Sequence, residues 1–392
     1  MASELLIGVG PGEWRAAWLE DGVAVELYVE RGDTCPVGSL HLGRVVRRVA
    51  GLDATLVDIG EERPGFLPLR PRGADAPRLD EGARVMVRVS REAQRGKGAR
   101  LSTQLSLRGE ADAVDIAERA AGLDPPAQLD PAPGFAAALA LRLPGVPERV
   151  LADDAAVLRE LRDAFPAGEI AHRAAADWPI DLDTLFESAL APTLALPGGG
   201  AIHFEDCRAA LLIDVDTGTP DSGSAGRAAL AVNLAAATVI ARQLRLRQLG
   251  GGIVIDFAAL DGRGPRERVR QAVATAIAGD PAVPLVLGWT RLGHLEIVRP
   301  RRGRPLGDAM LEPSGMRKSA TALAFDALRA LYREARARPA ANWRLVVSPG
   351  IAAALRGSAA KGLRALEARL GRSVMIDVAP GHDADAFDIV AR

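Results

Sequence analysis

Two acidic residues interrupt apolar stretches that are typical of strands. Asp214 and Asp256 each follow three apolar residues. A carboxylate buried in such a strand is costly unless it is paired, protonated or bound to a metal. If the strands are neighbours, the two carboxylates provide oxygen ligands for Mg²⁺, and Asp216 points to the same face as Asp214. We therefore predict a Mg²⁺-dependent phosphodiesterase site here; a loop-capping or arginine-paired acid is the alternative.

Arginine supplies nearly all of the positive charge and clusters near these acids in the sequence. Arg242 and Arg245 have the i, i+3 spacing of one helix face, which we expect to contact the phosphates of a phosphodiester substrate. Arg299 and Arg301 belong to a basic run after an expected strand, a second candidate phosphate surface. For any single arginine, a solvated position is an equally good interpretation.

The composition describes a folded protein with two or three domains. Of 392 residues, 48% are hydrophobic and 25% are charged, and the net charge of −1 excludes a uniformly basic coat. No uninterrupted apolar run reaches the roughly 18 residues of a membrane span, and the N-terminus lacks signal-peptide character. We expect a cytoplasmic protein. Cys35 and Cys207 are its two cysteines, too few for a disulfide framework or a cysteine-built zinc site.

The first third of the chain has the pattern of short strands. Residues 4–9, 15–19 and 23–28 predict a meander, with Asp21-Gly22 as a tight hairpin turn. Five further strands between residues 42 and 106 predict a small closed barrel of the OB type. Any other small barrel would give the same pattern.

The elements that carry the acids alternate between strand and helix. Helices are expected over residues 228–249 and 263–278, and the strands around them predict a sheet with helices packed on it. Residues 317–378 predict a separate small α/β domain. Residues 109–180 are rich in proline and carry little signal beyond one helix near 154–165.

Several ordered stretches resemble the ribonuclease E/G family of bacterial endoribonucleases. They are Leu-Pro-Gly-Gly-Gly at 196–200, the acid strand at 213–218, the arginine-rich stretch at 240–247, residues 249–257 and residues 293–299; residues 57–69 and 96–102 resemble the family's OB-type module. The resemblance implies an α/β protein: an RNase H-like catalytic domain with an inserted OB-type β-barrel and a small C-terminal α/β domain. The implied segments are the first RNase H-like strands (1–36), the OB-type RNA-binding module (37–108), a shortened sensor-like or linker region (109–180), the catalytic core (181–310) and the C-terminal domain (311–392).

The resemblance also implies an activity and its residues. The family hydrolyses single-stranded RNA with Mg²⁺ and leaves 5′-phosphate and 3′-hydroxyl ends. Asp214, Asp216 and Asp256 would be catalytic, the first and last as metal ligands. Phe66 and Lys97 match RNA-contacting positions of the OB-type module, where an exposed aromatic ring stacks on a base. Phe66 as a simple core residue is the alternative.

Three departures from the family pattern change these expectations. Asp216 stands where the family usually has asparagine, and Leu56 replaces a second aromatic residue. The paired cysteines that share zinc between subunits are missing after residues 299–304, so a homodimer would lack that link. No Arg-Thr motif for 5′-end sensing occurs in residues 108–180. The alternative function is a non-catalytic RNA-binding relative acting in ribosome or RNA turnover; a Mg²⁺-dependent nuclease for structured RNA or DNA is a further rival.

Overall fold

The computed structural model describes residues 2–31, 37–69, 79–93, 97–105, 110–130, 133–207, 209–218, 225–312 and 317–391. Within them the chain forms two compact units. Unit 1 comprises residues 1–29, 144–159 and 165–392, and unit 2 comprises residues 30–143 and 160–164. The expected domain boundaries at 36 and 108 fall in residues 32–36 and 106–109, outside the described residues. The other expected boundaries stay predictions.

Unit 1 begins with a five-stranded sheet of order β11-β10-β1-β2-β3. Its strands are β1 (Ser3–Gly10), β2 (Glu13–Glu20), β3 (Val23–Arg31), β10 (Arg149–Ala152) and β11 (Glu169–His172). The expected meander is confirmed, and Asp21 and Gly22 both have the positive φ that a type I′ hairpin turn needs. Strands β10 and β11 extend it in parallel on the β1 side. The sequence analysis assigned no strand to either segment.

A second, six-stranded sheet carries the acid strands. Its order is β12 (Thr193–Ala195), β13 (Ala201–Asp206), β14 (Leu211–Asp216), β15 (Gly251–Asp256), β17 (Leu295–Arg299) and β16 (Leu285–Trp289). Helix α5 (Ala225–Leu246) connects the parallel strands β14 and β15, as the expected alternation requires. The acids therefore lie in a different sheet from the N-terminal strands, although we expected both in one RNase H-like domain.

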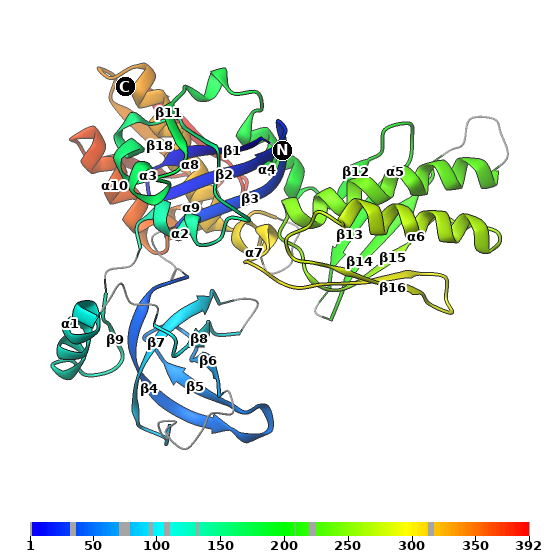
Figure 1. Cartoon of the computed structure of the whole chain (residues 1–392). Helices are drawn as coiled ribbons and strands as arrows, with labels where there is room; N and C mark the ends of the chain where they lie inside the picture. The colour runs from blue at the N-terminus through cyan, green and yellow to red at the C-terminus, as the bar shows by residue number, and fades with distance from the viewer. Residues whose placement is uncertain are drawn as a thin grey trace. The chain divides into compact units, whose positions relative to one another are not determined.

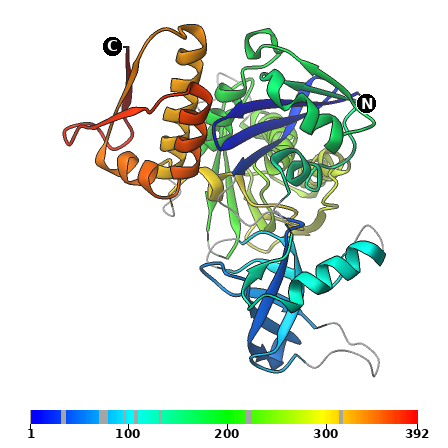
Figure 2. The same ribbon diagram turned by 90° about the vertical axis from the view of Figure 1, so that its left-hand side faces the viewer.

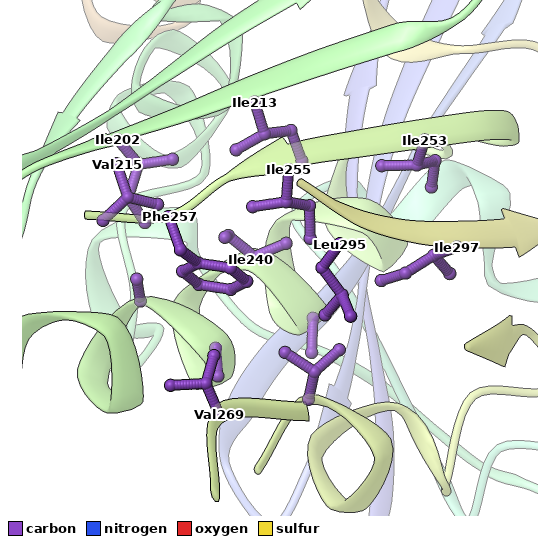
Figure 3. Packing of buried hydrophobic residues seen from close by; sticks show 14 of the residues in the cluster. Ile202, Ile213, Val215, Ile240, Ile253, Ile255, Phe257, Val269, Leu295 and Ile297 are labelled. Carbon is purple, nitrogen blue, oxygen red and sulfur yellow. The ribbon is translucent and has the colours of Figure 1, made fainter. Parts of the chain in front are cut away.

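In the part of the chain that the structure describes, helices pack on one face of this second sheet. Both α5 and α6 (Arg263–Ile277) run along the same side of the strands (Figure 1). Inward-facing residues such as Ile213 and Ile255 pack against Ile240 and Val269 of these helices in one hydrophobic core (Figure 3). Side chains that alternate with the core residues therefore point to the uncovered face.

Helix α5 tests the expectation that the chain has no membrane span. That expectation was based on the lengths of uninterrupted apolar runs. By length and composition the stretch Gly226–Leu246 is long and apolar enough to cross a membrane, and half of it is buried inside the protein. Packing against the sheet accounts for this apolar character, because a helix that lies on a core must be apolar along the buried side.

The C-terminal part of unit 1 is a small α/β arrangement, as expected. Its elements are α8 (Ala320–Ala337), β18 (Trp343–Val347), α9 (Pro349–Arg356), α10 (Ala360–Leu370), β19 (Met375–Val378) and β20 (Phe387–Ala391). The strand order is β19-β18-β20, and the sequence analysis did not predict β20. Unit 1 also contains α4 (Leu182–Leu190) and α7 (Leu306–Met310).

Unit 2 contains a closed five-stranded barrel. Its strands are β4 (Leu40–Val49), β5 (Ala54–Asp58), β6 (Gly65–Pro68), β7 (Arg84–Arg91) and β8 (Arg100–Ser102). The order β5-β6-β8-β7-β4 closes through pairing of β5 with β4, and β6 runs parallel to β8. This is the Greek-key arrangement of an OB-type barrel, so the expected barrel is confirmed.

Unit 2 also contains short elements outside the barrel. Helix α1 (Glu110–Ala121) packs beside the barrel through Ile116 and Ala120 (Figure 2). Strand β9 (Ala127–Gln128) pairs with β4, and α2 (Phe135–Ala140) follows it. The expected helix near residues 154–165 is present as α3 (Leu158–Ala164).

Candidate active site

Asp214 and Asp256 face each other across two neighbouring strands. They are register partners in the parallel pair β14–β15, at the carboxyl end of each strand. Adjacent strands lie about 4.8 Å apart, so the two carboxylates share one level on one face of the sheet. The sheet thus brings together the two acids that are 42 residues apart in the sequence.

Both acids are exposed, which corrects the expectation of buried carboxylates. In β14, residues 211, 213 and 215 are buried, whereas Asp214 and Asp216 are exposed. Asp256 is 60% exposed. The alternation has period two, so each acid points away from the core and pays no burial penalty. Leu212 is apolar although it lies on the exposed face, so the sequence of this strand does not show the alternation of apolar and polar residues.

Few protein groups neutralise these acids. Across the residues that the structure describes, the Asp214 carboxylate has no hydrogen-bonding or ionic partner. Asp256 Oδ2 lies 3.6 Å from His294 Nε2, and Asp216 Oδ1 accepts a hydrogen bond of 2.9 Å from the Gly218 amide. Like charges directly opposite each other on two strands are destabilising. A cation between Asp214 and Asp256 would remove that repulsion.

The glycine-rich turn at 196–200 fixes the end of strand β14. Gly200 has φ of +87°, and a Cβ at this position would collide with the carbonyl oxygen of Asp216. The Leu196 amide closes the turn by donating to Gly200 O at 3.0 Å. Glycine is therefore required where the turn lies against the backbone of an acid residue.

Asn233 holds the segment that follows Asp256, a role that the sequence analysis did not assign. This α5 side chain is fully buried, donates to Ala258 O at 2.8 Å and accepts from the Ala258 amide at 3.0 Å. Both bonds tie the backbone two residues after Asp256 to the helix. An asparagine within an apolar run of α5 was the sequence signal for this contact.

Arg242 and Arg245 are not close to the acids. They lie on α5, which covers the opposite face of the sheet, and they line a groove of about 650 Å³ with Val25 and Arg268. Arg242 donates to Ala24 O at 2.9 Å, and burial lowers the pKa of its guanidinium. This groove, and not the acid pair, is the surface that Arg242 offers to a ligand.

Arg245 is committed to two carboxylates of the first sheet. Its guanidinium is buried and bonds to Glu20 at 2.6 Å and to Glu26 at 3.0 Å. Its hydrogen bonds lower the pKa of the Glu20 carboxyl. The side chain therefore joins α5 to β2 and β3, and its charge is already compensated.

Arg299 and Arg301 have different environments although they are two residues apart. Arg299 is 1% exposed and forms a two-bond ion pair with Asp280, at 2.6 and 3.1 Å. We do not propose it as an RNA contact. Arg301 is exposed and donates to Gly250 O at 3.0 Å. Gly250 precedes β15 and lies six residues before Asp256, so the contact of Arg301 with Gly250 is about 20 Å along that strand from Asp256.

Phe66 and Lys97 belong to the barrel of unit 2. Phe66 is half-buried in β6, and the Arg100 guanidinium lies 5.9 Å from its ring centre. Leu56 is its register partner, so the ring has an aliphatic neighbour on β5. Lys97 is exposed. A part of the Phe66 ring is thus available for stacking, next to the guanidinium of Arg100.

The acid pair fits a magnesium ion better than a metal with many protein ligands. Nowhere in the described residues do three His, Cys, Asp or Glu side chains gather closely enough to hold an ion. Mg²⁺ keeps several waters and commonly uses only one or two carboxylates together with substrate phosphates. Two exposed and opposed carboxylates meet that requirement.

The chain is similar to known ribonucleases. Residues 176–302, which include all three acids, match the model of the Ribonuclease E/G family. The chain is 25% identical to Ribonuclease G of Escherichia coli over 489 aligned positions that cover all of both proteins. It is 24% identical to Ribonuclease G of Haemophilus influenzae, with 99% of each covered. A match to Ribonuclease E of Nostoc has 28% identity and covers 74% of this chain and 54% of that protein.

The alignment with Ribonuclease G of E. coli is longer than this chain. It has 489 positions, whereas this chain has 392 residues. The relative therefore contains segments with no counterpart here, in keeping with a shortened chain.

Proposed function

Because this chain belongs to the ribonuclease E/G family, we propose that it is a Mg²⁺-dependent endoribonuclease that hydrolyses single-stranded RNA. One observation carries the proposal: Asp214 and Asp256 are exposed register partners, and within the described residues neither carboxylate has a lysine or arginine partner. The proposed setting is RNA processing or decay in the cytoplasm, and the proposed products carry 5′-phosphate and 3′-hydroxyl ends.

The acids would act together on one phosphodiester. Asp214 and Asp256 hold the metal, and bound Mg²⁺ supplies charge neutralisation at the scissile phosphate and a water of lowered pKa. Asp216 is held by the Gly218 amide through one oxygen, and its second oxygen is available to orient a water or a substrate group. Asn233 fixes the backbone behind Asp256, so the carboxylates keep their separation during turnover.

The substrate would be bound mainly through its backbone and single unpaired bases. Arg301 offers an exposed guanidinium to phosphates. In the barrel, Phe66 offers a stacking surface, with Lys97 and Arg100 as phosphate partners. Phe66→Ala is expected to weaken single-strand binding by about 1–3 kcal/mol.

We also propose the RNase H-like description for the five-stranded sheet of unit 1. A three-stranded antiparallel meander extended by two parallel strands beside β1 supports it. This sheet would position the acid sheet and would carry no metal ligand itself. A homodimer would have to form without a cysteine zinc link.

One assay tests the function. Labelled single-stranded RNA, duplex RNA and DNA are incubated with the protein in Mg²⁺ or in EDTA, and product ends are mapped. We expect cleavage of single-stranded RNA in Mg²⁺ only, and its loss in Asp256→Asn with an unchanged melting temperature. RNA binding without cleavage would identify the non-catalytic relative, and preferred cleavage of duplex RNA or DNA would identify another nuclease class.

A further inference from the structure

Trp289 lies at the same edge of the second sheet as the acid pair. Strand β16 runs parallel to β15, because both strands pair antiparallel with β17, and Trp289 ends β16 as Asp256 ends β15. Leu295 is the register partner of both Trp289 and Ile255, so two strand spacings, about 10 Å, separate Trp289 from β15. In open α/β sheets, ligands bind outside the carboxyl ends of the strands. Trp289 therefore belongs to the edge at which a substrate of the acid pair would bind.

The Trp289 ring has an aromatic and a cationic neighbour. The Phe257 ring, from the residue that follows Asp256, lies 6.0 Å from it between ring centres, at an interplanar angle of 56°. The Trp289 indole N–H donates to Arg266 O at 3.2 Å, and the Arg266 guanidinium carbon lies 5.8 Å from the Trp289 ring centre. Phe257 is buried, whereas Trp289 is partly exposed and Arg266 is exposed. The contact with Phe257 thus fixes the indole close to the backbone of Asp256.

The charge of Arg266 is not compensated by an acid in the described part of the chain. Its neighbour Glu267 is paired with Arg270. A guanidinium beside a partly exposed indole can bind a phosphate while the ring stacks on a base, and base stacking tolerates any sequence. A single nucleotide strand supplies phosphates and bases in this alternation.

The path of such a strand crosses the edge of the sheet. Successive residues of a β-strand point to opposite faces, so the Asp256 carboxylate and the Phe257 ring lie on opposite sides. An RNA strand with one phosphate at the acids reaches the indole by passing over the end of β15. The base next to that phosphate must then be unpaired, because a base inside a duplex is stacked on its neighbours and cannot stack on the protein.

We propose that Trp289 and Arg266 form a nucleotide-binding subsite beside the acid pair, in which an unpaired base stacks on Trp289 and an adjacent phosphate binds Arg266. This inference rests on the proposed function, because it takes RNA as the substrate of the acid pair. It deepens that function, since the subsite selects unpaired nucleotides next to the scissile phosphate.

The first test measures binding and cleavage of labelled single-stranded RNA by the full chain. Trp289→Leu keeps an apolar side chain and removes the stacking surface, so RNA affinity should fall and KM should rise by about 5–140-fold, the equivalent of one base stack. The value of kcat should change much less. Trp289→Phe keeps an aromatic ring and should restore most of the affinity, and melting temperatures establish that both variants are folded.

A second arginine–tryptophan pair provides the matched control. Arg266→Gln should lower the slope of log affinity against log salt concentration by about 0.7, which corresponds to one phosphate contact of a single strand. The Arg338 guanidinium carbon lies 4.8 Å from the Trp343 ring centre in the C-terminal part of unit 1. Arg338→Gln should leave both the KM and the salt dependence unchanged.

Photocrosslinking tests which base occupies the subsite. Single-stranded RNAs that carry one 4-thiouridine, at each position in turn, are irradiated with the full chain, and the crosslinked residue is identified by mass spectrometry. We expect a crosslink to Trp289 from positions next to the cleaved bond and from no distant position.

The outcomes separate this inference from the proposed function. Wild-type affinity and KM in Trp289→Leu, or no crosslink to Trp289 from any RNA, overturns the subsite; if the wild type still cleaves RNA in Mg²⁺, the proposed function stands alone. Wild-type protein that crosslinks through Trp289 without cleaving RNA supports the subsite and overturns the proposed catalysis. Wild-type protein that neither binds nor cleaves RNA overturns both.

Discussion

The acids of the first two sheets are in opposite situations. In the first sheet, Glu13 and Glu26 are almost fully buried, and each bonds to an arginine from a distant part of unit 1. In the second sheet, Asp214 and Asp256 are exposed, and within the described residues neither forms an ion pair with a lysine or arginine. The carboxylate charge is thus neutralised by arginine in the first sheet, and it has no arginine partner at Asp214 and Asp256 in the described part of the second sheet.

The difference shows which acids are available for chemistry. A buried carboxylate must be paired, because removing its partner leaves an uncompensated charge. An exposed carboxylate needs no partner, and two of them held at one level repel each other until a cation binds. Ion pairs with arginine therefore stabilise the first sheet. The repulsion between Asp214 and Asp256 in the second sheet would instead favour binding of a metal cation.

The largest effect should come from the open pair. Asp214→Asn removes a metal ligand, and the loss of several kcal/mol of transition-state stabilisation corresponds to at least about a thousandfold slower RNA cleavage. The free energy of unfolding should stay the same or rise slightly, because the repulsion with Asp256 disappears. Cleavage rates and urea titrations measure both. A loss of stability with normal cleavage would mean that the pair is structural.

The next effect should come from the compensated acids. Arg245→Met leaves Glu26 buried without its cation, and we expect the free energy of unfolding to fall by about 3 kcal/mol in urea titrations. RNA affinity of the folded variant should not change. Weaker RNA binding without any loss of stability would instead restore the expected RNA-contact role of Arg245.

The pH dependence of stability should distinguish the two sheets further. Hydrogen bonding to Arg245 lowers the pKa of Glu20 below its ordinary value of 4.5. Since the folded-state pKa is depressed, this contact contributes stability above pH 4.5 and loses it as the pH falls through the folded-state value. Urea titrations below pH 5 should show a shallower decline in Arg245→Met than in the wild type. Equal slopes would contradict the assignment.

The smallest effect should come from an exposed ion pair, in which the acid belongs to neither of these two classes. Arg270 and Glu267 form an exposed ion pair one turn apart on α6. Solvent and salt screen such pairs, so Arg270→Ala should not change the melting temperature measurably. A clear shift would show that exposure alone does not separate compensated acids from open ones.

Local patterns in the sequence predicted most helices and strands. The remaining strands form because they pair with strands that are distant in the sequence. The Asp21-Gly22 turn and the strand–helix alternation around Asp214 are local signals, and both proved correct. Strand β10 has four residues in a proline-rich region and exists because it pairs with β1. A sequence pattern cannot specify such a partner.

The site shows the same division. The pairing of Asp214 with Asp256 was predicted, because a helix between two strands implies a parallel pair. The position of His294 follows from the β15–β17 register, and the burial of Arg299 follows from Asp280, 19 residues away in another segment. Neither contact leaves a spacing signal in the sequence, and Arg299 was therefore expected to contact RNA.

The pairing of Arg15 with Asp326 has a consequence for how the protein is made. The two residues are bonded and 311 positions apart. At about 5–20 residues per second, a ribosome needs roughly 15 to 60 seconds between them. During that interval Arg15 and Glu13 can pair with each other, but their distant partners Asp326 and Arg329 have not yet been synthesised. Completion of the first sheet is therefore a late event of translation, and a nascent chain stalled before α8 should be especially dependent on chaperones.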